Sequence, residues 1–313
     1  MNEEIFDKKV IILEGDITDK ESIKAALNYD FNILINCAAC VKHFGELDFF
    51  KRINVDGVAN LAELYIEKKA RFIHISTMSV AGISYNSNVK ILKENKLNIG
   101  QKVKFNGYVY TKYLAEKIVL KAIAEKNLDA KIIRLGNLMS RKKDGKFQIN
   151  FTTNYLMNNV KAYAFLQCFP LQFLDETEEL SPVDEAARAV LLLAGTERKF
   201  TVFHAYNSHS IKLKDIIIAL RKTGFNIDIS DEIEFNIKLK KVIADEKMHE
   251  FISPLLHYKI DNDENYSDNL FENIFTVKAL YKLGFQWSLT DIDYIQKSIE
   301  QLKNLGFFER RTK

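Results

Sequence analysis

Two residues that could carry acid–base chemistry, Tyr108 and Lys112, stand four positions apart in a segment with a helical pattern. Residues at positions i and i+4 share one face of a helix. We therefore expect the Lys112 ammonium to lie near the Tyr108 hydroxyl and to lower its pKa from about 10 by favouring the phenolate. Such a tyrosine can exchange a proton with a carbonyl oxygen during hydride transfer, and the lysine could also reach a ribose hydroxyl.

The spacing alone does not identify a site, because it recurs at Tyr65/Lys69 and Tyr113/Lys117. The position of Thr77 distinguishes the Tyr108/Lys112 pair, since Ser76-Thr77 follows a buried-strand pattern over residues 71–75. Ligands of an α/β sheet bind at the ends of its strands. A threonine there can donate a second hydrogen bond to the same substrate oxygen. Thr77, Tyr108 and Lys112 are therefore the predicted catalytic residues.

Short apolar runs alternate with helical patterns through the first two thirds of the chain. The predicted strands cover residues 10–13, 31–36, 71–75, 131–135 and 201–205, and the predicted helices cover residues 18–27, 47–69, 108–126 and 182–194. Thr18 is the expected N-cap of the first helix. Residues 82–107 are expected to form a polar surface excursion. Unbroken apolar strands separated by helices predict an α/β fold with a parallel sheet that is covered by helices on both faces.

After about residue 209 the pattern becomes mainly helical. Helices are predicted at 212–223, 231–245, 275–283 and 290–304, the last of them starting at Thr290. We therefore expect two domains, a sheet-containing domain at 1–208 and a smaller helical subdomain at 209–313.

Charge and composition exclude several classes of protein. The 45 lysines and arginines nearly balance the 42 aspartates and glutamates, so no basic field favours a nucleic-acid partner. With 47% hydrophobic and 28% charged residues, the composition is that of a folded domain. No apolar run approaches the roughly 18 residues of a membrane span, and the first residues lack the apolar segment of a signal peptide. Three cysteines are too few for a disulfide scaffold, so we expect a cytoplasmic protein.

Metal chemistry is not expected. Cys37 and Cys40 are interpreted as packing residues, and Asp175-Glu176 with Glu178-Glu179 as an acidic loop. His74 is expected in the core, and His204 and His209 lack a matching carboxylate cluster.

Glycines are few and widely spaced. The chain has 12, and no two of them are separated by only one or two residues. The glycine-rich turn G-x-G-x-x-G is therefore impossible, and Gly145-Lys146 is followed by Phe147, which rules out a Walker A loop.

Several segments, in chain order, resemble the extended short-chain dehydrogenase/reductase superfamily. They are Gly15-Asp16-Ile17, Asn36-Cys-Ala-Ala39, Asn54-Val-Asp-Gly57, Ser76-Thr77, Tyr108/Lys112 and Arg134-Leu-Gly-Asn-Leu138. Within it, the chain most resembles the terminal thioester reductase domains of nonribosomal peptide synthetases. That similarity is carried by His43-Phe-Gly45, Ile75-Ser-Thr-Met-Ser-Val80, Asp144-Gly145, Ser181-Pro-Val-Asp-Glu-Ala-Ala-Arg188 and Leu283-Gly-Phe-Gln-Trp287.

The resemblance implies a Rossmann-type, doubly wound sheet and NADPH-dependent reduction of a peptidyl or acyl thioester held on the phosphopantetheine arm of a carrier protein. It implies cofactor contacts from Asp16, Ile17, Ala38, Ala39, Val41, Asn54, Tyr108, Lys112, Gly136, Asn137 and Leu138. It places His43, Met78 and Ser79 near the substrate. Leu135 stands where a proline is more usual, and Thr111 where a serine is usual.

The chain departs from this family at its start. Such reductases open with a strand, a glycine-rich turn and a helix that hold the cofactor pyrophosphate. This chain begins just before the third strand, as if about 60 residues, the size of the usual opening unit, were missing. We therefore expect the 313-residue chain alone to be poorly folded or inactive, and to bind NADPH weakly if at all.

Two other functions stay open. One is a reductase or epimerase that acts on a free small molecule such as a nucleotide sugar, for which the C-terminal part would supply diphosphate-binding arginines. The other is a cofactor-free Rossmann-like binding protein. The absent glycine turn favours it, whereas the set of Thr77, Tyr108 and Lys112 disfavours it.

Overall fold

Two units make up the chain in the computed structural model, which describes residues 10–42, 45–85, 88–243, 252, 254–255 and 266–309. Unit 1 comprises Met1–Leu135, Leu193–His204 and Tyr266–Thr276. Unit 2 comprises Gly136–Leu192, Ala205–Asn265 and Val277–Lys313. The chain therefore passes between the units several times. The assignment of 1–208 to the cofactor and 209–313 to the substrate stays a prediction.

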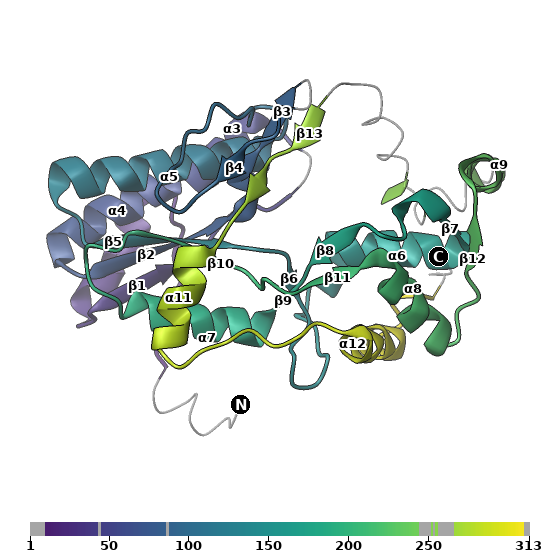
Figure 1. Ribbon diagram of the computed structural model, residues 1–313. Coiled ribbons are helices and arrows are strands. Elements are labelled where there is room, and N and C mark those ends of the chain that lie inside the picture. The colour runs from purple at the N-terminus through teal and green to yellow at the C-terminus, as the bar shows by residue number, and fades with distance from the viewer. Residues whose placement is uncertain are drawn as a thin grey trace. The chain divides into compact units, whose positions relative to one another are not determined.

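A four-stranded sheet forms the centre of unit 1, in the order β1-β2-β5-β10 (Figure 1). Its strands are β1 (Ile33–Asn36), β2 (Arg71–Thr77), β5 (Ala130–Leu135) and β10 (Val202–Ala205). β1 and β5 both pair with β2 in parallel. These strands are the apolar runs that the sequence predicts, and the expected α/β fold with a parallel sheet is confirmed.

Helices α4 (Gly57–Lys68) and α5 (Gly107–Lys126) lie side by side against one face of this sheet (Figure 1). The core between them is apolar and includes Leu61, Tyr65, Phe72, Ala115, Val119 and Ile132. The predicted helix over 47–69 is interrupted, because α3 (Leu47–Lys51) continues into a π-helical turn at Arg52–Asp56 before α4 begins. Asn106 caps α5 by accepting a hydrogen bond from the Val109 N–H, which sets where this helix starts.

The start of the described chain differs from the prediction. Residues 10–13 form no strand, and the side chains of Val10, Ile11, Ile12 and Leu13 are 45–77% exposed. A strand is stable only where its backbone groups find partners, and no described strand pairs with this run. The next helix is also shorter than expected. It comprises α2 (Lys20–Ile23), capped by Asp19 rather than Thr18, and a 3-10 turn at Lys24–Asn28.

The predicted polar excursion contains two short strands. β3 (Ile83–Tyr85) pairs with β13 (Tyr266–Asp268), and β4 (Ile91–Leu92) pairs with β14 (Leu270–Phe271). These long-range pairs bring residues 266–276 into unit 1. There Phe275, near the start of α11 (Ile274–Lys282), stacks on Phe203 of β10.

Unit 2 has its own apolar core. The core contains apolar side chains from α6 (Tyr155–Leu166), α8 (Leu213–Lys222), α9 (Glu232–Ile243) and α12 (Ile292–Asn304). Most of α7 (Val183–Ala194) and of α11 also belongs to this unit. Three small strand pairs join β6 (Leu138–Met139) to β9 (Ser181–Pro182), β7 (Cys168–Pro170) to β12 (Asp228–Ser230), and β8 (Thr177–Glu179) to β11 (Ser210–Lys212).

The mainly helical pattern predicted after residue 209 is confirmed for α8, α9, α11 and α12. Helix α12 begins later than expected, because the Asp291 side chain, not Thr290, accepts the Tyr294 N–H. Helix α6 is not in the prediction.

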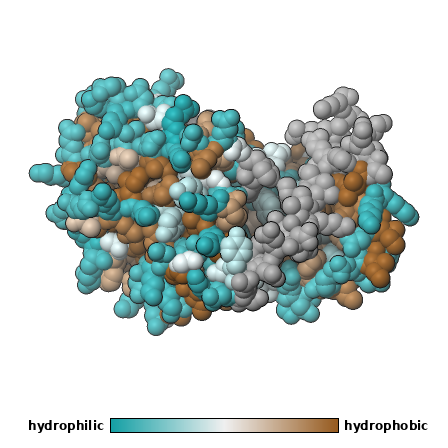
Figure 2. All heavy atoms as spheres, turned by 90° about the horizontal axis from the view of Figure 1, so that it is seen from above, coloured by the Kyte–Doolittle hydropathy of each residue, from teal (hydrophilic) through white to brown (hydrophobic). Residues whose placement is uncertain are grey.

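The surface of the described residues mixes hydrophilic and hydrophobic side chains, as Figure 2 shows for one face. No described helix is both long and apolar enough to cross a membrane.

Candidate active site

The three predicted catalytic residues come together at the carboxyl end of β2. Thr77 is the last residue of this strand, and Tyr108 and Lys112 lie in the first two turns of α5. The Thr77 side chain hydrogen-bonds to Tyr108. The Lys112 Nζ donates to the Ile75 carbonyl oxygen at 2.6 Å, two residues before Thr77. The structure thus brings the three side chains to one place, and their catalytic role is a proposal.

Burial controls the charge of this group. It raises the pKa of Tyr108, and the hydrogen bond with Thr77 opposes that effect only in part. Burial lowers the pKa of Lys112 to about 8, against the opposing charges of Glu116 and Cys37. The expectation that Lys112 lowers the pKa of Tyr108 is therefore wrong for this structure. The phenol is neutral near pH 7, which makes it a proton donor rather than a base.

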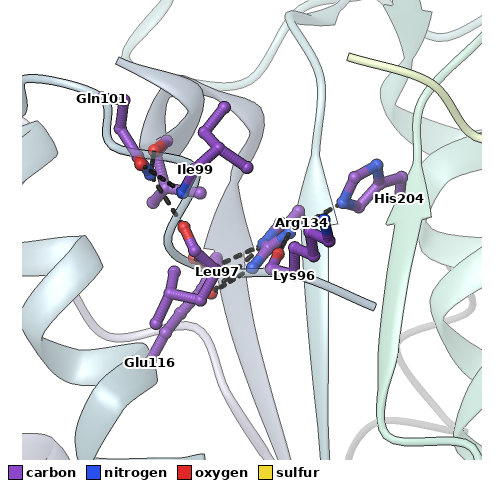
Figure 3. Close-up of polar contacts among 9 residues, drawn as sticks. Lys96, Leu97, Ile99, Gln101, Glu116, Arg134 and His204 are labelled. Atoms are coloured by element: carbon purple, nitrogen blue, oxygen red, sulfur yellow. Dashed lines mark hydrogen bonds and ion pairs between the residues drawn. The ribbon is translucent and has the colours of Figure 1, made fainter. Parts of the chain in front are cut away.

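A buried ion pair lies one helical turn beyond Lys112 (Figure 3). Arg134 on β5 donates to both carboxylate oxygens of Glu116 on α5, with the shortest contact at 2.7 Å, and both side chains are fully buried. Ser76, next to Thr77, donates its hydroxyl to the same carboxylate at 2.6 Å. A buried pair is stable only when its remaining polar atoms are also satisfied. This pair therefore fixes α5 against β2 and β5, directly behind the candidate site.

The remaining donors of Arg134 lead to β10. One guanidinium nitrogen contacts His204 Nε2 at 2.8 Å and donates to the Lys96 carbonyl oxygen at 3.2 Å (Figure 3). The His204 Nδ1 lies 2.5 Å from the Glu272 carbonyl oxygen. Burial and the charge of Arg134 lower the pKa of His204 to about 3. The imidazole is thus neutral, donates through Nδ1, and accepts at Nε2.

This network was not predicted from the sequence. Two signals for it are present there: Glu116 stands four residues after Lys112 on the same helix, and the charged Arg134 stands between Ile133 and Leu135 in a buried strand.

Asn54 supports the turn after β1. This buried side chain lies in the π-helical turn, accepts the Cys40 N–H at 2.7 Å and donates to the Cys40 carbonyl oxygen. Its amide also donates to the Thr111 hydroxyl on α5 at 3.0 Å. Asn54 therefore holds the Cys40 backbone to the residue next to Lys112.

The predicted cofactor residues after β1 are exposed or half-buried. Ala38 and Val41 are exposed and Ala39 is half-buried, so small side chains follow the end of β1. The Ala38 N–H donates to Asn36 Oδ1 at 3.0 Å, which shapes this turn.

Asp16 and Ile17 lie before α2. Asp16 is exposed, and the Thr18 N–H holds its carboxylate and lowers its pKa. Ile17 packs on α4 at Gly57, where an added Cβ would come within 2.7 Å of the Ile17 side chain. A cofactor contact from either residue stays a prediction.

Gly136, Asn137 and Leu138 follow β5 directly and belong to unit 2. The Asn137 N–H donates to Glu179, an acidic residue that the sequence analysis assigned to a loop. Of the predicted substrate residues, His43 lies outside the described part of the chain. Met78 is buried and Ser79 is exposed, and the Ser79 N–H donates to Thr77 Oγ1 at 3.1 Å.

Metal ligands do not gather among the residues that the structure describes. Cys37 is exposed and Cys40 is buried. His74 is fully buried on β2, as expected.

The residues present fit a nicotinamide cofactor in part. A buried lysine beside a tyrosine and a threonine suits a ribose and a reacting carbonyl group. The described residues hold no glycine-rich turn that could approach a pyrophosphate closely.

A parallel sheet with a Thr/Tyr/Lys set at its carboxyl edge defines a Rossmann-type protein of the extended short-chain dehydrogenase/reductase class. The chain belongs to the Male sterility protein family, an NAD-binding family whose profile matches residues 1–190.

Relatives and solved structures are consistent with this membership. The chain is 26% identical over 157 residues to L-2-aminoadipate reductase of Schizosaccharomyces pombe, in an alignment that covers 50% of this chain and 11% of the relative. It is 34% identical, with a TM-score of 0.87, to the structure of a thiolation-reductase di-domain from an archaeal non-ribosomal peptide synthetase, covering 98% of this chain and 64% of that one.

The terminal R domain from the myxalamid PKS-NRPS biosynthetic pathway shares the fold, with 18% identity, a TM-score of 0.82, and coverage of 99% of this chain and 78% of that one. The resemblance to terminal reductase domains of nonribosomal peptide synthetases is thereby confirmed. The chain spans only about a tenth of the yeast relative and under two thirds of the archaeal di-domain.

Proposed function

We propose that this protein reduces a peptidyl or acyl thioester, held on a carrier protein, to an aldehyde with NADPH as the hydride donor. The observation that carries the proposal is the convergence of Thr77, Tyr108 and Lys112 at the end of β2. The 34% identity to a thiolation-reductase di-domain over nearly the whole chain supports the same chemistry.

When bound, NADPH would supply a hydride to the carbonyl carbon of the thioester. Tyr108 and Thr77 donate hydrogen bonds to the carbonyl oxygen, and Tyr108 protonates that oxygen as its charge develops. The product is a hemithioacetal, which collapses to an aldehyde and the free thiol of the carrier arm. A second hydride would convert the aldehyde to an alcohol.

Lys112 has a positioning role in this scheme. Its ammonium is held by the Ile75 carbonyl oxygen, beside β2 and behind Tyr108 on the same helix face. From there it orients the ribose of the cofactor and provides positive charge near the tyrosine. This charge stabilises the tyrosinate that remains after proton transfer.

NADPH rather than NADH, a phosphopantetheinylated carrier protein as partner, and a cytoplasmic location are proposed from the resemblance and from the composition. Residues 209–313 are the proposed surface for the acyl group and the carrier. Its test is to replace this region by that of a sugar-acting relative, which should abolish turnover of carrier-bound thioester. Turnover that survived the exchange would place the carrier surface elsewhere.

The decisive experiment measures NADPH oxidation with an acyl thioester on a carrier protein and, in parallel, on free coenzyme A. Aldehyde formation that requires the carrier supports the proposal. Activity on a free nucleotide sugar alone would favour the small-molecule reductase instead. Absence of any cofactor binding would favour a cofactor-free binding protein, which the missing glycine turn allows.

A further inference from the structure

A carboxylate in unit 2, that of Glu179 at the end of β8, joins three separate segments. Its Oε2 accepts the Asn137 N–H at 2.6 Å, directly after β5. Its Oε1 accepts the hydroxyl of Ser181, the first residue of β9. The N–H of Asn207, which follows β10, donates to the Ser181 hydroxyl oxygen at 2.9 Å and also acts on the Glu179 carboxylate. One side chain therefore holds the segments that leave two neighbouring strands of the sheet.

Gly136 makes this arrangement possible. A Cβ added to it would lie 2.1 Å from Glu179 Oε2 and 2.6 Å from the Cβ of Tyr206. Any side chain at position 136 would therefore displace the carboxylate or the backbone of residue 206. The absence of a side chain lets the carboxylate lie against the Gly136–Asn137 turn.

The carboxylate is held by hydrogen bonds and not by a cation. In the described part of the chain, Glu179 forms no ion pair with a lysine or arginine. The negative charge of Glu178 on the same strand also raises the pKa of Glu179. The charge of Glu179 in turn raises the pKa of Tyr294 on α12. Burial raises the pKa of Glu179 to about 7, although the three hydrogen bonds act in the opposite direction.

Ionisation decides how strongly the Asn137 N–H is held. An ionised carboxylate accepts charge-assisted hydrogen bonds, which are about twice as strong as neutral ones. A protonated Glu179 can donate from Oε1 to the Ser181 hydroxyl oxygen, because a hydroxyl also accepts. The bond from the Asn137 N–H to Oε2 is then neutral and weaker.

We propose that Glu179 is a positioning residue that fixes the Gly136–Asn137 turn firmly when it is ionised and less firmly when it is protonated. The consequence for catalysis rests on the proposed function and on the family resemblance, which implies cofactor contacts from Gly136 and Asn137. Glu179 would then make cofactor binding depend on pH without contacting the reacting atoms.

The first test measures hydrogen exchange of the Asn137 amide in the full chain by NMR, corrected for the intrinsic exchange rate at each pH. In the wild type, protection should fall about tenfold between pH 8 and pH 6, the size expected when one charge-assisted hydrogen bond becomes a neutral one. In Glu179→Gln it should be low and independent of pH.

Glu178→Gln is the matched control and should behave as the wild type, because successive side chains of a strand point to opposite faces. Protection in the wild type that does not change with pH, or an equal effect of both variants, would overturn the proposal.

The second test measures KM for NADPH and kcat of the active protein from pH 6 to pH 8. We expect KM to rise about tenfold on acidification in the wild type, and Glu179→Gln to show the raised KM at every pH, with kcat nearly unchanged. A KM in Glu179→Gln that still follows pH would refute the role of this residue. If the chain with a glycine-rich strand–turn–helix segment fused to its N-terminus oxidises no NADPH, the proposed function fails, and the amide exchange alone decides whether Glu179 holds the turn.

Discussion

The ammonium of Lys112 and the carbonyl oxygen of Ile75 lie 2.6 Å apart, so the second turn of α5 is tied to the backbone of β2. Ile75 precedes Ser76, which binds Glu116, and Thr77, which binds Tyr108. Three consecutive residues of one strand thus contact three residues of one helix. These contacts between β2 and α5 position the candidate site, which therefore does not depend on a loop. Such a rigid support suits chemistry that needs fixed distances.

Tyr108→Phe removes the proposed proton donor. We expect NADPH oxidation with the thioester substrate to fall by at least about 10²-fold, the usual contribution of acid catalysis, while the protein stays folded. Steady-state kinetics on the purified variant check this. Tyr113→Phe, five residues further along the same helix, is the control and should keep full activity. A Tyr108→Phe variant as fast as the wild type would rule out the assignment.

Lys112→Met should alter the pH dependence of stability. The pKa of Lys112 is about 8 in the folded protein and 10.5 in the absence of its surroundings. Between these values the unfolded chain binds more protons than the folded one, so the stability of the wild type rises with pH there. Relative to Lys112→Met, the wild type should therefore gain stability from pH 8 to pH 10. Urea unfolding at several pH values measures the difference.

The exposed Lys117→Met on the same helix should show no such change. If the free energies of unfolding of the wild type and of Lys112→Met differed by the same amount at every pH, the pKa of Lys112 would not be lowered by folding.

Breaking the Glu116–Arg134 pair should be costly. Glu116→Gln or Arg134→Met leaves one charge buried without its partner and should destabilise the protein by about 3–5 kcal/mol. The double variant Glu116→Leu/Arg134→Met should recover much of this loss, because both charges are then gone. Chemical denaturation of all four proteins checks the prediction. Additive losses in the double variant would show that the two side chains do not act as a pair.

NADPH should bind weakly to the 313-residue chain. None of its 12 glycines provides the turn that brings backbone N–H groups close to a pyrophosphate. Calorimetric titration of the chain should give a Kd well above micromolar. Fusion of the glycine-rich strand–turn–helix of a related reductase to its N-terminus should tighten it. Micromolar affinity without that segment would show that the pyrophosphate is held in another way.

The sequence predicted the elements that bury apolar runs. β2, β5 and α5 were found because their apolar residues recur at the spacing of a strand or a helix and because tertiary contacts do not oppose them. Residues 10–13 have the same kind of apolar pattern but form no strand, because a strand also needs a hydrogen-bonded neighbour. Helix α6 was missed, and its sequence carries two consecutive asparagines, which are poor helix formers.

The sequence predicted which residues form the candidate site, but it did not predict their pKa values. The four-residue spacing placed Lys112 on the same helix face as Tyr108, but it could not show that burial raises the pKa of the tyrosine. The contacts of Arg134 with Glu116 and of Glu179 with Asn137 join residues 18 and 42 positions apart. No local pattern predicts such pairs, because they depend on how the chain folds back on itself.

The exposed run Val10–Leu13 has a practical consequence for handling this protein. Four consecutive aliphatic side chains at the surface form an aggregation-prone segment, and an unpaired segment of this kind adds readily to the edge of another molecule's sheet. Light scattering by solutions of the chain should therefore rise more steeply than in proportion to the protein concentration. A charged residue in place of Ile12, which is 77% exposed, should improve solubility without disturbing the core.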